Sequence, residues 1–196
     1  FIEAAGHLAR LRSAVAASGQ RLSDTDLVGL LTAEADLRLH SGDAGYAREL
    51  LDTAWTQATA SGQADLLGAV ALGLDSIGAR FSMPRADLVA VLKTARDALN
   101  STGTTTEAKV TAALVRQLQH SVPADRPQAR PLADQAVGIA RTLDDPATLA
   151  SCMLAQHDAL WTPGTATARA AIAAEIAGLA KQANDQEGHA QALLLV

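Results

Sequence analysis

Residues 30–58, LLTAEADLRLHSGDAGYARELLDTAWTQA, decide the fold class of this chain. Small and apolar side chains, among them Ala35, Ala47 and Ala54, recur at three- and four-residue spacing on both sides of the Gly-Asp pair at 42–43. That spacing places them on one face of a helix, and Gly-Asp favours a turn. The stretch therefore predicts two amphipathic helices joined by a tight turn.

The second helix of this hairpin recurs along the chain with a period of 41 residues. Small residues at a fixed phase allow the helices of stacked copies to approach closely. Turn-like stretches at 60–63, 100–103, 143–146 and 183–186 punctuate the copies, and ASGQ occurs both at 17–20 and at 60–63. The phased positions are Ala54, Ala95, Ala136 and Ala177; Leu51, Leu92, Ala133 and Ala174; and Ala47, Leu88, Ala129 and Ala170.

Helical periodicity between these turns predicts about ten helices. Several starts carry capping residues: Ser23 or Asp24, Asp145 followed by Pro146, and Thr165. The expected helices span residues 2–18, 24–41, 44–60, 64–81, 85–100, 104–121, 127–143, 146–161, 165–183 and 186–196.

The composition agrees with an all-α fold. Hydrophobic residues make up 48% of the 196 residues but aromatic residues only 3%, which favours close-packed helices over sheets. The net charge of −5, with scattered lysines and arginines, argues against direct contact with nucleic acid. No apolar run has the length of a membrane span. Cys152 is the only cysteine, so we expect a small buried hydrophobe and a reducing, cytoplasmic compartment.

The hairpin at 30–58 resembles the tetratricopeptide repeat, with a small residue in helix A, a Gly-Asp turn and small residues in helix B. The resemblance implies an α-α superhelix of antiparallel helices in which the even-numbered helices are the A helices. The consensus period of that family is about 34 residues, so longer helices and loops such as 121–130 would absorb the difference. HEAT-type pairing remains an alternative. We expect one helical-repeat domain over 1–196, cut from a longer multidomain chain.

The last third of the chain resembles the helical-repeat region of large actinobacterial transcriptional regulators. The similar stretches are IARTLDDPATLA at 139–150, HDALW at 157–161 and PGT at 163–165. In these regulators a STAND-type ATPase module precedes the repeats, and many carry a LuxR-type or SARP-type DNA-binding domain. The resemblance implies a scaffold or sensor arm that contacts a protein partner, adjacent domains of its own chain or a small-molecule effector.

The sequence contains no pattern that indicates an enzyme, a metal site or a bound cofactor. GTTTEAK at 103–109 lacks the second glycine of a phosphate-binding loop, so no nucleotide site is expected in this segment. The resemblance to the regulators implies that ATP binds in an adjacent domain. Cys152 and His157 are separated by about 500° of helical rotation and do not share a face. Neither HExxH nor paired CxxC is present. Asp144 and Asp145 stand at an expected helix start, where carboxylates cap backbone N–H groups.

The corner at residues 157–165 combines polar, aromatic and turn-forming residues. Pro163-Gly164 favours a type II turn. We expect Trp161 to fill the groove between hairpins while His157 or Asp158 hydrogen-bonds the backbone of the turn; the alternative is a ligand stacked on Trp161. If the even-numbered helices line a concave surface, further candidates for a binding channel are Arg80, Arg116, Gln119, His120 and His157.

Two other classes of function remain open at this point. One is an α-helical enzyme or small-molecule-binding protein with an enclosed cavity near Trp161, His157 and His120. The other is a self-association module, because the apolar residues Leu193, Leu194 and Leu195 could pair two copies into a homo-oligomer.

Overall fold

The computed structural model describes residues 1–77, 85–120 and 124–195, and within these residues it contains helices and turns but no strand. The all-α prediction is confirmed, and the helix boundaries within these residues lie close to those expected; the end expected at residue 81 lies outside the described residues. The helices are α1 (Ile2–Ser18), α2 (Asp24–His40), α3 (Ala44–Ser61), α4 (Ala64–Ile77), α5 (Arg85–Leu99), α6 (Thr105–Gln119), α7 (Arg126–Ala140), α8 (Pro146–Ala159), α9 (Ala166–Gln182) and α10 (Gln186–Leu193).

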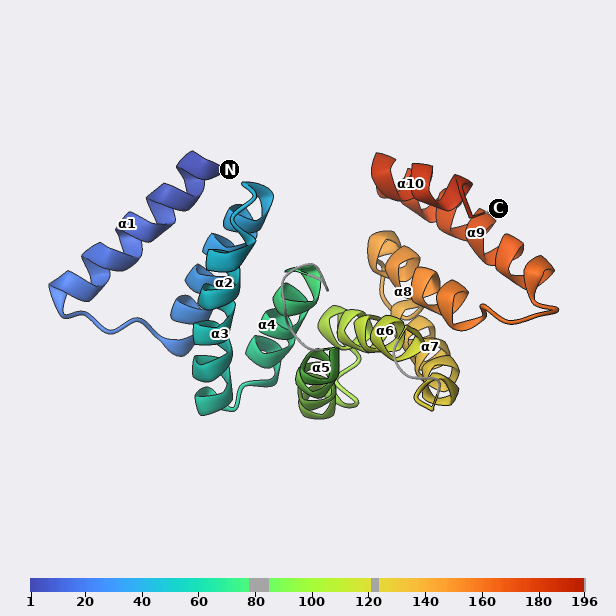
Figure 1. Ribbon diagram of the computed structural model, residues 1–196, viewed down its shortest axis with the longest axis horizontal. Coiled ribbons are helices and arrows are strands. Elements are labelled where there is room, and N and C mark those ends of the chain that lie inside the picture. The colour runs from blue at the N-terminus through green and yellow to red at the C-terminus, as the bar shows by residue number, and fades with distance from the viewer. Residues whose placement is uncertain (78–84, 121–123, 196) are drawn as a thin grey trace. The chain divides into compact units, whose positions relative to one another are not determined.

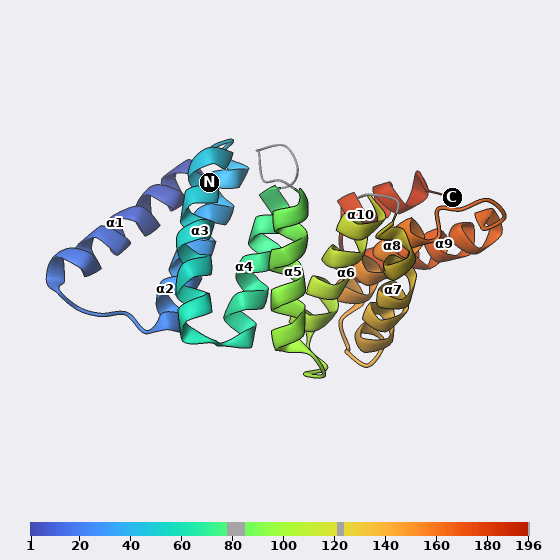
Figure 2. The same cartoon turned by 60° about the horizontal axis from the view of Figure 1, so that its bottom comes forward.

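The helices pack into two compact units, residues 1–99 and 100–196. In the first unit α1 packs on α2, α2 pairs with α3, and α4 pairs with α5 (Figures 1 and 2). In the second unit α6 pairs with α7, α8 with α9, and α10 packs on α9. The boundary falls between α5 and α6, so each unit holds two complete helical hairpins and one further helix.

Within each unit the even-numbered helices also contact each other. α2 packs against α4 in the first unit, and α6 packs against α8 in the second. In the described part of the chain no comparable contact joins α3 to α5 or α7 to α9. This arrangement supports the expectation that the even-numbered helices are the first helices of the hairpins.

The phased alanines form the interior of the odd-numbered helices. Ala54, Ala95 and Ala136 are fully buried, and Ala177 is nearly so. The residues at the other two phased positions are buried in α3, α5 and α7. In α9 they are not, because Ala170 is half-buried and Ala174 is exposed. The buried residues of α9 are instead Ala173, Ile176, Ala177 and Ala180. The buried face of the last copy is therefore rotated relative to the 41-residue phase.

Local hydrogen bonds explain most helix ends. Ser23 and Asp145 cap α2 and α8 through their side chains, as expected. Gly19 and Gly62, in the two ASGQ stretches, both adopt φ near +68. Thr165 occupies the N-cap position of α9, as expected, but its side chain makes no capping hydrogen bond to the first turn.

The TTTE part of GTTTEAK caps the start of α6 in a variant of the capping box, in which the glutamate accepts from amides that precede the N-cap residue. The Thr104 side chain accepts from the Glu107 amide at 3.2 Å. The buried Glu107 carboxylate accepts from the backbone amides of Ser101 and Gly103 at 3.0 and 2.8 Å. The loop before α6 is thereby tied to its first turn.

None of the helices in the described residues combines the length and apolar composition that crossing a membrane requires.

Candidate functional site

The corner between α8 and α9 is a type II turn, as the sequence predicts. Gly164 has φ +84, and the Thr165 amide donates to the Thr162 carbonyl at 3.4 Å. The Thr165 hydroxyl donates to the carbonyls of Leu160 and Thr162. The turn is thus held by Thr165, and not by His157 or Asp158 as expected.

Trp161 lies on the surface of this corner, which corrects the expectation that it fills a groove between hairpins. Its side chain is 62% exposed. The guanidinium carbon of Arg169, on the first turn of α9, lies 3.7 Å from the centroid of the indole. α8 ends at Ala159, so Trp161 follows the helix instead of continuing its buried face. Arg169 was missed by the sequence analysis because it lies across the turn.

His157 is fully buried in α8 and therefore does not present its ring to a binding channel. Neither ring nitrogen makes a hydrogen bond. Nδ1 lies 3.6 Å from a carboxylate oxygen of Asp158, and the imidazole and the Trp161 indole lie at 72° to each other with their centroids 5.9 Å apart. A buried polar atom without a hydrogen bond costs roughly 1–3 kcal/mol, so His157 is held by the packing around it.

The end of α6 reaches the same corner through His120. Its Nε2 lies 3.9 Å from the other carboxylate oxygen of Asp158, which places the half-buried Asp158 between two imidazoles. The structure thus gathers His120, His157, Asp158 and Trp161, together with Arg169, into one cluster, which we call the Trp161 corner. Arg116 and Gln119 lie on the last turn of α6, exposed and half-buried respectively. Arg80 lies outside the described residues.

The Trp161 corner offers recognition chemistry. Its exposed indole and stacked guanidinium present a planar surface to aromatic, cationic or carboxylate groups.

Cys152 of α8 is buried, and its Sγ lies 3.6 Å from the Ala108 carbonyl oxygen. Desolvation raises the pKa of the thiol to about 12. It is the small buried hydrophobe that the sequence predicts. Among the described residues, no group of three or more potential ligands could hold a metal ion.

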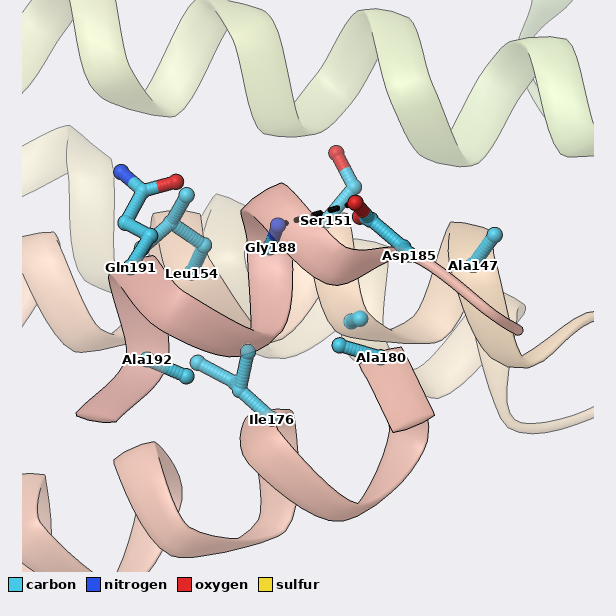
Figure 3. Close-up of a pocket in the computed structure, with 10 residues that line it drawn as sticks. Ala147, Ser151, Leu154, Ile176, Ala180, Asp185, Gly188, Gln191 and Ala192 are labelled. Carbon is cyan, nitrogen blue, oxygen red and sulfur yellow. Dashed lines mark hydrogen bonds between the residues drawn. The ribbon is translucent and has the colours of Figure 1, made fainter. Parts of the chain in front are cut away.

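A small pocket of about 190 Å³ lies between α8, α9 and α10 of the second unit (Figure 3). Leu154 of α8, Ile176 of α9 and Ala192 of α10 line it. The Asp185 carboxylate at its edge accepts from the Gly188 amide at 2.9 Å and caps α10. Its one carboxylate is therefore engaged in helix capping.

The first unit contains a buried ionic network that the sequence analysis missed. The Glu34 carboxylate of α2 is fully buried and accepts from Arg12 Nε of α1 at 3.1 Å. Arg38, one turn further along α2, approaches the other Glu34 oxygen at 3.8 Å. Arg12 also donates to the Tyr46 hydroxyl at 2.9 Å, and Arg38 lies over the Tyr46 ring. The network links α1, α2 and α3.

No protein-family model matches the chain. No curated protein matches it. A function for this chain is therefore inferred from the geometry of the Trp161 corner and from the resemblance of the last third of the sequence.

Proposed function

We propose that this chain is a non-catalytic interaction or sensing scaffold within an ATP-dependent transcriptional regulator, and that the Trp161 corner contacts a protein partner or an adjacent domain of the same chain. The observation that carries the proposal is the exposed indole of Trp161 with Arg169 stacked 3.7 Å from its centroid.

Tryptophan and arginine are the residue types most enriched among those that dominate the energetics of protein interfaces. The Trp161 indole contacts the Arg169 guanidinium on one face and lies nearly perpendicular to the buried His157 ring. An ordered aromatic side chain loses little conformational entropy when a partner covers it. The corner therefore has the properties of an interface anchor.

The regulator context is supported by the resemblance of residues 139–165, which includes the corner itself. In this proposal ATP binds in an adjacent domain and the segment described here carries no cofactor. Helical repeats contact only their neighbours and can flex, so a partner held at one hairpin could change how the attached domains are arranged.

A photo-crosslinking experiment tests this proposal in the full-length protein. Trp161 is replaced by p-benzoylphenylalanine, and cells are irradiated before mass spectrometry of the crosslinked product. We expect crosslinks to another domain of the chain or to a separate protein. The same replacement of Arg130, exposed on α7, is the matched control and should give none. Equal crosslinking at the two positions would contradict the proposal.

Two exposed leucines favour self-association as a second candidate function. Leu194 is 87% exposed and Leu193 on α10 is 57% exposed. Light scattering of the Leu193→Ser/Leu194→Ser variant should show a smaller particle than the parent if these residues pair two copies. Leu11→Ser, at a similarly exposed leucine of α1, is the control. An enclosed ligand cavity is less well supported, because Trp161 and His120 lie at the surface.

A further inference from the structure

The first unit contains a groove of about 480 Å³ that lies between α1, the segment that joins α1 to α2, and the adjacent faces of α2 and α3. This volume is within the range of pockets that bind small molecules, about 300–1,000 Å³. In Figure 1 the segment runs from the end of α1 to the start of α2. Its residues Gln20, Arg21 and Leu22 line the groove. We call this site the α1–α2 groove.

The α1–α2 groove has an apolar part and a cationic part. Val15 of α1, Leu22 of the joining segment and Leu27 of α2 supply apolar surface. The cationic residues Arg12 and Arg21 line the same groove. A ligand with one apolar end and one anionic end would match both parts.

Arg12 is fixed in position by the buried network. Its Nε donates to Glu34 at 3.1 Å and its Nη2 to the Tyr46 hydroxyl at 2.9 Å. Nη1 has no partner among the described residues, and the side chain is one-third exposed. The buried carboxylate therefore orients a guanidinium at the groove wall and leaves one of its nitrogens available to a ligand.

Arg21 is the second cation of the groove. It is exposed and forms no hydrogen bond or ion pair with any described residue. Asp24 also lines the groove, but it stands in the first turn of α2, where the helix N-terminus favours a carboxylate. The Arg12 charge is already paired with the buried Glu34 carboxylate, so Arg21 is the cation of the groove that forms no ion pair with a described residue.

We propose that the α1–α2 groove binds a small amphipathic carboxylate. Its carboxylate is held by Arg12 and Arg21, and its apolar body lies on Val15, Leu22 and Leu27. The ligand would bridge α1 and α2, so its binding would tighten the packing of α1 on the first hairpin. This site is separate from the Trp161 corner and does not depend on the function proposed for that corner.

Calorimetric titration of the purified chain with decanoate, below its micelle concentration, tests the proposal. We expect saturable binding that weakens about tenfold or more in Arg21→Gln, because a charge-assisted hydrogen bond is lost. Arg130→Gln, on α7 of the other unit, removes an equally exposed arginine and should bind as the parent does. Arg21 is chosen over Arg12 because removal of Arg12 would leave the Glu34 carboxylate buried without its closest partner.

Decyltrimethylammonium, which has the same chain length and the opposite charge, distinguishes this site from adsorption on apolar surface. We expect no saturable binding of this cation. Hydrogen exchange with and without decanoate should show protection of residues 12–27. The proposal is overturned if decanoate does not bind saturably, if Arg21→Gln binds it as the parent does, or if the cation binds equally well.

Discussion

The guanidinium carbon of Arg169 lies 3.7 Å from the centroid of the Trp161 indole, and this pair lies at the surface and not in the core. The two residues come from opposite sides of the turn between α8 and α9. This surface contact sets the stability change that we expect when Trp161 is replaced.

Trp161→Ala should lower the free energy of unfolding by about 1 kcal/mol or less, which is the range of an exposed cation–π contact. A buried tryptophan would cost roughly 3–5 kcal/mol. Urea unfolding monitored by circular dichroism measures the difference. Leu114→Ala, at a fully buried position of α6, is the control and should cost about 2–5 kcal/mol. A loss at Trp161 as large as that at Leu114 would show that the indole is a core residue.

Glu34→Gln should destabilise the first unit. The substitution keeps the size of the side chain but removes the carboxylate charge. Arg12 Nε and Arg38 Nη2 lie 3.1 and 3.8 Å from the two carboxylate oxygens. Loss of a buried partner can cost roughly 3–5 kcal/mol. Here both arginines reach solvent, so we expect about 1–2 kcal/mol.

Glu49→Gln is the control for this prediction, because Glu49 is an exposed glutamate on α3 of the same unit. Chemical denaturation of both variants gives the comparison. An unchanged midpoint in Glu34→Gln would mean that the network contributes no net stability.

Asp145→Asn should reduce the acid sensitivity of α8. The hydroxyl of Thr148 donates to the Asp145 carboxylate, the Thr148 and Ala147 amides donate to it as well, and these bonds hold the pKa of Asp145 below its usual value. A carboxyl group whose pKa is depressed in the folded state stabilises the fold above its unfolded pKa. That contribution is lost as the pH falls from about 4 through the lower folded pKa.

The measurement is the unfolding midpoint as a function of pH in the parent, Asp145→Asn and Asp144→Asn. We expect Asp145→Asn to be less stable than the parent at neutral pH, with the two converging in acid. Asp144 is an exposed neighbour outside the cap and serves as the control. A constant difference across the pH range would argue against the cap as its source.

The thiol of Cys152 should react with a disulfide reagent only after unfolding. It is buried, and desolvation raises its pKa to about 12, so almost no thiolate is present at pH 8. The rate of 5,5′-dithiobis(2-nitrobenzoate) reaction in buffer and in urea tests this. Fast labelling of the native chain would mean that the second unit opens readily around α8.

The helices, their turns and the phased alanines could be predicted from the sequence because each depends on residues close together in the chain. Ser23 and Asp145 cap helices that begin immediately after them. Gly164 takes the positive φ that its own turn requires. Ala54, Ala95 and Ala136 lie on the buried stripes indicated by their spacing.

The candidate site depended on contacts between distant residues and on small differences at helix ends. Successive helical residues are rotated by about 100°, so the end of α8 at Ala159 was enough to put Trp161 at the surface. The same sensitivity exposes Ala174 although it follows the repeat phase.

The sequence by itself determined the all-α class, the positions of the helices and the small residues between them, because periodicity, turns and caps act over a few residues. Only the tertiary structure decided that His157 is buried, that Arg169 stacks on Trp161, and that the buried Glu34 accepts a hydrogen bond from Arg12 of another helix. These outcomes depend on which helix covers each face, and that choice is made by packing between segments far apart in the chain.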